Sequence, residues 1–197
     1  MAVDFKGIDY KRGSVYRFDP KHIKIVPNLC ARHEPPNEEK IKWLMNQFLD
    51  PAIGQIEPIF IRRDGKDSPP ILIAGHRRWE AATRINQQNL TPVPFLLDCV
   101  YQEVNESEGF KIAVQENIRE ATTPWDDAYN IRTLTKLCGM DTAAIAALYG
   151  EEESWVKSRL ELISLGPECF LDSAKPLWTG SKERSDTRVE DRGQERR

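Results

Sequence analysis

The pattern of apolar positions differs between the two halves of the chain. In the first half, short apolar runs predict strands over residues 14–18, 22–25, 58–62, 70–74 and 93–100. Between them, apolar residues at helical spacing predict an amphipathic helix over residues 38–48. A small sheet interrupted by helices predicts an α+β or α/β layer domain.

The second half shows helical periodicity from Glu106 onward. Thr123 followed by Pro124 predicts the N-cap and first residue of a new helix. Asp141 or Thr142 is expected to cap the short helix that follows. This half of the chain is therefore predicted to be all-α.

Ala146, Gly150 and Val156 occur at the offsets of a helix-turn-helix motif. Such a motif needs a small residue where its helices touch, a glycine in the turn and an apolar residue that anchors the second helix. The alternative is an antiparallel helix pair that has no ligand.

The second helix of this pair is predicted to begin with three glutamates, Glu151 to Glu153. Their negatively charged carboxylates repel DNA phosphates, although Glu can accept a hydrogen bond from a cytosine amino group. Lys157 and Arg159 compensate for these negative charges only in part.

A glycine turn follows the apolar run at residues 71–73, where Gly75 and His76 precede Arg77 and Arg78. This order predicts a strand, a turn and a helix with both arginines in its first turn. A helix start presents backbone N–H groups and a partial positive charge, so adjacent guanidinium groups make it a candidate phosphate site. The alternative is an ordinary solvated, charged helix face.

Composition narrows the classes of function. The chain has 197 residues and 40% hydrophobic content, enough for one or two small domains. Its formal net charge of −3 argues against broad, non-specific nucleic-acid binding, so a DNA contact must be local. A disulfide framework is not expected, because the four cysteines are scattered along the chain: Cys30, Cys99, Cys138 and Cys169. A zinc site is not expected either, because the histidines lack metal-ligand spacing: His22, His33 and His76.

The sequence shows neither a signal-peptide pattern at its start nor an apolar run of the ~20 residues that a membrane span needs. A cytoplasmic location without a membrane partner is therefore expected. The final stretch, residues 181–197, has Val189 as its single aliphatic residue and is expected to be disordered.

Taken in order, these features resemble ParB-type partition proteins over residues 20–168. The motifs that carry the resemblance are Pro27 to Arg32, Gly54 to Ile59, Gly75 to Ala81, Glu116 to Glu120, and the Ala146, Gly150, Val156 helix pair. The resemblance implies a ParB/sulfiredoxin-like α+β nucleotide-binding domain over 1–118 and an incomplete helix-turn-helix DNA-binding domain over 119–170. A disordered polar tail over 171–197 completes the expected organisation.

The resemblance also assigns nucleotide-binding residues. Arg77 and Arg78 would hold a CTP triphosphate with backbone help from Gly75, and Glu116 and Asn117 would meet Mg²⁺ and phosphate. Guanidinium groups suit phosphate oxygens, and oxygen ligands suit Mg²⁺. For Glu116 and Asn117, the alternative is a solvated helix end.

Two further positions complete the implied nucleotide site. Arg32 belongs to the family's first motif and would lie near the nucleotide. His76 stands where the family usually has Glu. Gly75 stands where sulfiredoxins place a nucleophilic Cys, which argues against sulfinic acid repair.

By the same resemblance, Ser154, Lys157, Ser158 and Arg159 would contact a specific centromere-like DNA site. The implied partners are a ParA-type ATPase and a second copy of the chain, joined through the N-terminal domain in a nucleoid- or plasmid-associated complex. The alternative function is a ParB-like metal-dependent nuclease or nucleoside triphosphatase. Slow CTP hydrolysis is compatible with both.

Overall fold

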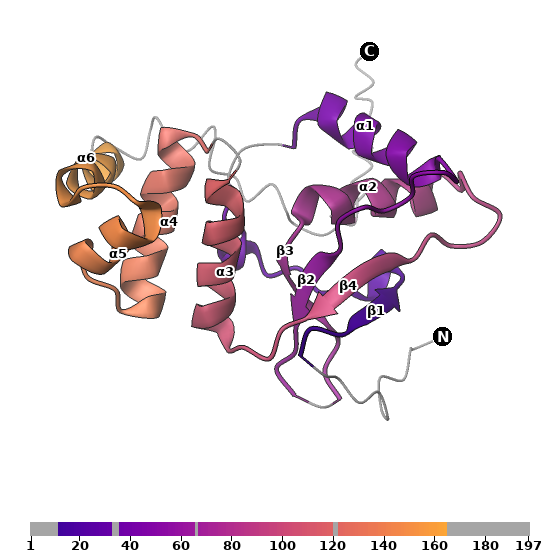
Figure 1. The fold of residues 1–197 in the computed structure, drawn as a ribbon, viewed down its shortest axis with the longest axis horizontal. Coiled ribbons are helices and arrows are strands. Elements are labelled where there is room, and N and C mark those ends of the chain that lie inside the picture. Colours follow the sequence, from indigo (N-terminus) through magenta and orange to yellow (C-terminus); the bar gives the residue numbers. More distant parts are fainter. Residues whose placement is uncertain (1–11, 33–35, 66, 120–121, 165–197) are drawn as a thin grey trace, which may run out of the picture.

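The computed structural model describes residues 12–32, 36–65, 67–119 and 122–164 (Figure 1). The predicted tail over 171–197 lies outside these residues. The first part of the chain forms β1 (Val15–Phe18), α1 (Glu38–Leu49), β2 (Ile59–Arg62), β3 (Ile71–Ala74), α2 (His76–Gln87) and β4 (Leu97–Tyr101). The helices α3 (Glu106–Ile118), α4 (Pro124–Cys138), α5 (Thr142–Tyr149) and α6 (Glu153–Ser164) follow.

The strands form one mixed sheet in the order β1-β4-β2-β3. The β2 and β4 strands are parallel, whereas β4 pairs with β1 and β2 pairs with β3 in antiparallel fashion. A core joins the sheet to α1 and α2, with fully buried Ile41, Ile59, Ile85 and Leu97 at its centre. The prediction of an α+β fold with a small mixed sheet is confirmed.

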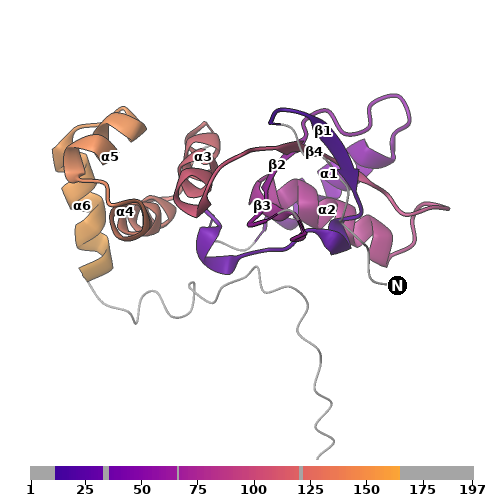
Figure 2. The ribbon, with the colours of Figure 1, turned by 90° about the horizontal axis from the view of Figure 1, so that it is seen from below.

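A second core lies on the other side of β3, where α3 stands between the sheet and α4 to α6 (Figures 1 and 2). Phe110 and Val114 of α3 share this core with Ile73 of β3 and with Ile131 and Val156 of the helices beyond. Helix α3 therefore packs against both halves of the chain. The domain boundary after residue 118 stays a prediction.

Two of the predicted strands differ from the structure. Residues 22–25 form no strand: Pro20 begins a 3-10 turn, and Lys24 makes a single parallel bridge to Ile71. The strand expected from residue 93 begins only at Leu97. Pro94 contributes to this late start, because proline has no N–H to donate to a neighbouring strand.

Side-chain caps set the starts of four helices. Asn37, Asn105, Thr123 and Asp141 each accept a hydrogen bond from a backbone N–H in the first turn of α1, α3, α4 and α5. The structure thus selects Asp141, rather than Thr142, as the cap of α5.

The helix pair α5 and α6 has the predicted packing. Ala146 and Val156 are buried, and Gly150 has a φ of 71°, which ends α5 in the left-handed region. The prediction that three glutamates open α6 is wrong, because α6 begins at Glu153. The N–H of Glu151 donates to Ala146 at 3.0 Å, so this residue still belongs to the turn.

Gly75 has the least space around it of the described glycines. Its φ is 99°, and a Cβ added there would lie 2.6 Å from Cγ2 of Ile59 on β2. Glycine therefore lets the chain turn from β3 into α2 directly against the sheet.

We expect Gly75→Ala to lower the free energy of unfolding by roughly 2–4 kcal/mol, through backbone strain and overpacking against Ile59. Two matched controls separate these causes. Gly139 also has a positive φ, 63°, but the methyl group added by Gly139→Ala would lie in open space. Gly65 has no positive φ, and the methyl group added by Gly65→Ala would make only an ordinary contact at 3.5 Å. In urea unfolding, the loss of unfolding free energy should be largest for Gly75→Ala, smaller for Gly139→Ala and smallest for Gly65→Ala. Equal losses for Gly75→Ala and Gly139→Ala would show that the contact with Ile59 adds nothing to the backbone strain.

Candidate functional site

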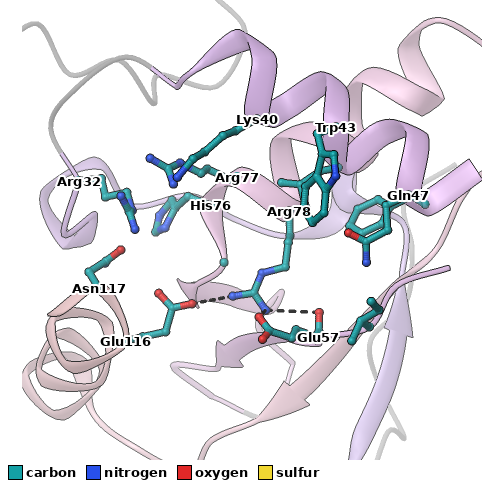
Figure 3. Close-up of a pocket in the computed structure, with 14 residues that line it drawn as sticks. Arg32, Lys40, Trp43, Gln47, Glu57, His76, Arg77, Arg78, Glu116 and Asn117 are labelled. Carbon is teal, nitrogen blue, oxygen red and sulfur yellow. Dashed lines mark hydrogen bonds and ion pairs between the residues drawn. The ribbon is translucent and has the colours of Figure 1, made fainter. Parts of the chain in front are cut away.

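A cavity of about 450 Å³ opens between α1, the start of α2 and the end of α3 (Figure 3). Its volume is in the range of small-molecule sites. The residues that line it include every predicted nucleotide-binding residue: Arg32, Gly75, His76, Arg77, Arg78, Glu116 and Asn117. Three segments far apart in the sequence therefore meet at one cavity.

The first turn of α2 forms the floor of this cavity. Gly75 is the N-cap, and Arg77 and Arg78 lie in the first turn, as predicted. The first N–H groups of a helix have no carbonyl partner within the helix and carry partial positive charge. The floor is therefore suited to an anion.

Arg78 joins three parts of the site. Its Nη1 donates to the carbonyl oxygen of Pro58 at 2.7 Å. Its Nη2 donates to Glu116 Oε1 at 2.6 Å (Figure 3). Glu57 adds a longer ion pair at 3.4 Å, and only 13% of the Arg78 side chain is exposed. Arg78 thus ties α2 to the start of β2 and to the end of α3.

The other cationic side chains lie at one end of the cavity. Figure 3 shows Arg32, Lys40 and Arg77 around this end, close to Asn117. Asn117 is buried, and its Nδ2 donates to the carbonyl oxygen of Ala113 at 2.8 Å. This bond holds the amide so that its oxygen points toward Arg32.

His76 is buried beneath the cationic end. Burial, together with the positive charge of Arg32, lowers the pKa of His76 to about 4. The imidazole is therefore neutral at neutral pH and adds no charge to the cavity.

The site offers oxygen ligands for a metal. Among the described residues, no group of three or more His, Cys, Asp or Glu side chains could hold a metal ion by itself. Glu116 and Asn117 bring a carboxylate and an amide oxygen to the cavity. This donor set fits Mg²⁺, which usually takes one or two carboxylates and completes its shell with water and substrate phosphates.

Sequence analysis missed the wall that α1 contributes. Lys40, Trp43 and Gln47 line the cavity from one face of this helix. A signal was present, because the spacing i, i+3, i+7 places them together on a helix. Trp43 also lies off the buried stripe of α1, which comprises Ile41, Met45 and Phe48.

The predicted DNA-contacting residues divide into two groups. Ser154, Lys157 and Ser158 are exposed on α6. Arg159 instead faces α4, where its Nε lies 3.7 Å from Asp127 Oδ2 and its guanidinium lies over the Trp155 ring. Burial raises the pKa of Asp127, and the charge of Arg159 opposes this shift. The structure thus does not bring Arg159 together with the other three.

None of the helices in the described part of the chain is long and apolar enough to cross a membrane.

The buried His76 makes stability depend on pH. In the unfolded chain its pKa is ordinary, about 6.5, so between this value and about 4 the unfolded state binds a proton that the folded state does not. The free energy of unfolding should therefore fall as pH drops through this window, with a slope approaching about 1.4 kcal/mol per pH unit.

Urea unfolding of the wild-type chain and of His76→Gln across this window measures the effect. We expect the variant to show a shallower dependence, because glutamine does not titrate. If the unfolding free energies of the wild-type chain and the variant changed equally with pH, the lowered pKa of His76 would be contradicted.

Comparisons with known proteins identify the relatives of this chain. The model of the ParB N-terminal domain family matches residues 10–118. A nucleoid occlusion protein from Oceanobacillus iheyensis is 27% identical over 176 residues, which cover 87% of this chain and 58% of that protein. The chain spans about half the length of the curated relatives that it matches.

Two solved structures of C-terminally truncated ParB from Caulobacter crescentus also align. The one complexed to the centromeric parS site has a TM-score of 0.51 at 20% identity and covers 79% of this chain and 75% of that chain. The one complexed with CTP-γ-S has a TM-score of 0.44 at 21% identity and covers 81% of this chain and 83% of that chain. The likeness to the parS complex shows a shared fold. With the family model matching more than half of its residues, this chain belongs to the ParB N-terminal domain family.

Proposed function

We propose that the cavity binds CTP together with Mg²⁺, and that this binding controls attachment of α5 and α6 to a centromere-like DNA site. The observation that carries the proposal is the meeting of all the predicted nucleotide-binding residues at one cavity of suitable size. The choice of CTP among nucleotides follows from the ParB-type resemblance.

Different residues of the cavity bind the phosphates and the Mg²⁺ ion. Arg32, Arg77 and the backbone N–H groups at the start of α2 hold phosphate oxygens, because they line the cationic end of the cavity. Arg78 acts through Glu116, whose carboxylate it holds at 2.6 Å. Glu116 and Asn117 hold Mg²⁺, which would supply further positive charge to the phosphates.

Helix α3 supplies a physical link between nucleotide and DNA. Its last turn carries Glu116 and Asn117, and its first half packs Phe110 into the core shared with α4 to α6. A movement of α3 in response to nucleotide would therefore shift the helices that carry the DNA-binding face.

The DNA-binding face comprises the exposed residues of α6, Ser154, Lys157 and Ser158. These donors suit phosphate and base contacts. Arg159 has a positioning role, because it packs against Asp127 and Trp155 and thereby fixes α6 on α4.

At the level of the cell, we propose a nucleoid- or plasmid-associated protein in the cytoplasm that acts in DNA partition or nucleoid occlusion. A ParA-type ATPase and self-association through the N-terminal domain follow from the ParB-type resemblance. The alternative, a metal-dependent nuclease or nucleoside triphosphatase, would use the same cavity and would be recognised by rapid turnover.

The first test is titration calorimetry of the chain with CTP in Mg²⁺. We expect Arg77→Ala to weaken CTP binding by about 10- to 100-fold, because it removes charge-assisted hydrogen bonds worth roughly 1.5–3 kcal/mol. Lys42→Ala is the matched control, since Lys42 is exposed on α1 and does not line the cavity. Equal affinities of the two variants would contradict the phosphate role of Arg77.

The second test concerns DNA. We expect Lys157→Ala to weaken binding of a centromere-like duplex and to lower the slope of log affinity against log salt by about 1, because one phosphate contact is lost. Lys136→Ala, an exposed substitution on α4, is the control and should leave the slope unchanged. If Lys157→Ala left the slope of log affinity against log salt unchanged, Lys157 would not be a phosphate contact.

A further inference from the structure

Trp43 is an unusual residue for its position. Helix α1 turns Ile41, Met45 and Phe48 into the core that it shares with α2 and the sheet, whereas the Trp43 side chain lies on the cavity wall and is 63% exposed. Exposing a large aromatic ring forgoes the stabilisation that its burial would give. A flat apolar face beside a polar cavity is suited to stacking by a planar ligand group.

Gln47 lies one helical turn beyond Trp43 on the same wall. Its Nε2 donates to the carbonyl oxygen of Gly54 at 3.4 Å. With the nitrogen turned toward this carbonyl, the amide oxygen serves as an acceptor. An acceptor beside a stacking platform suits a heterocycle that carries an amino group.

The cavity is also divided by charge. Figure 3 shows Arg32 and Arg77 at one end and Trp43 and Gln47 toward the other. Between them, Arg78 is occupied by Glu116, Glu57 and the Pro58 carbonyl. A ligand that spans the cavity therefore needs an anionic end and a planar, amino-bearing end.

We propose that Trp43 is the stacking platform for the nucleobase and that Gln47 accepts a hydrogen bond from its exocyclic amino group. This inference rests on the proposed nucleotide site and adds a means of discrimination to it. Cytosine presents an amino group where uracil presents a carbonyl oxygen, so Gln47 favours CTP over UTP.

The test is titration calorimetry with three probes in Mg²⁺: CTP, UTP and inorganic tripolyphosphate. We expect Trp43→Ala to weaken CTP binding by roughly 5- to 100-fold, the usual effect of losing one base–aromatic stack. Tripolyphosphate has no base, so its affinity should not change. Trp43→Phe should retain most of the CTP affinity, and Trp125→Ala, which alters an exposed indole away from the cavity, should retain all of it.

Gln47 variants test the discrimination separately. We expect Gln47→Leu to bring the affinities for CTP and UTP close together, because the acceptor is lost. Gln47→Glu retains an acceptor and should keep the preference for CTP. Urea unfolding of each variant checks that the fold is unchanged.

The outcomes separate this inference from the proposed function. If wild-type chain binds CTP and tripolyphosphate but Trp43→Ala binds CTP as tightly as wild type, the platform is elsewhere and the nucleotide site stands. An unchanged ratio of CTP to UTP affinity in Gln47→Leu overturns the role of Gln47. If wild-type chain binds none of the probes, both proposals fail.

Discussion

The close approach of Gly75 to Ile59 is the constraint on which the rest of the site depends. Because glycine has no Cβ, α2 begins directly against β2, and the first turn of α2 lines the cavity. The same first turn places Arg78 within reach of both Pro58 and Glu116. One backbone conformation thus sets the floor of the cavity and the contact between its two sides.

Two arginines connect helices through carboxylates: Arg78 bonds Glu116 of α3, and Arg159 of α6 lies beside Asp127 of α4. Arg32 and Arg77 line the cationic end of the cavity. Under the proposed function, Arg77 contacts phosphate, whereas the adjacent Arg78 positions Glu116.

Much of the fold could be predicted from sequence, because glycine turns, N-caps and apolar periodicity act locally, and so could the position of Arg77 and Arg78 in the first turn of α2. The spacing of Lys40, Trp43 and Gln47 shows that they share one face of α1. Their place on the cavity wall depends on how α1 packs beside α2, which the sequence does not show. The strand expected at residues 22–25 does not form: a 3-10 turn occupies residues 20–22, and Lys24 makes only an isolated bridge to Ile71. The start of α6 depended on the bond from Glu151 to Ala146, which composition does not reveal.

We propose that the start of α2 and the end of α3 bind one nucleotide between them. Backbone amide chemical shifts, recorded while CTP and Mg²⁺ are added, test this most directly. We expect the amides of Gly75, Arg77, Glu116 and Asn117 to shift together along a single saturable curve. Saturable shifts confined to other parts of the chain, with these amides unmoved, would contradict it.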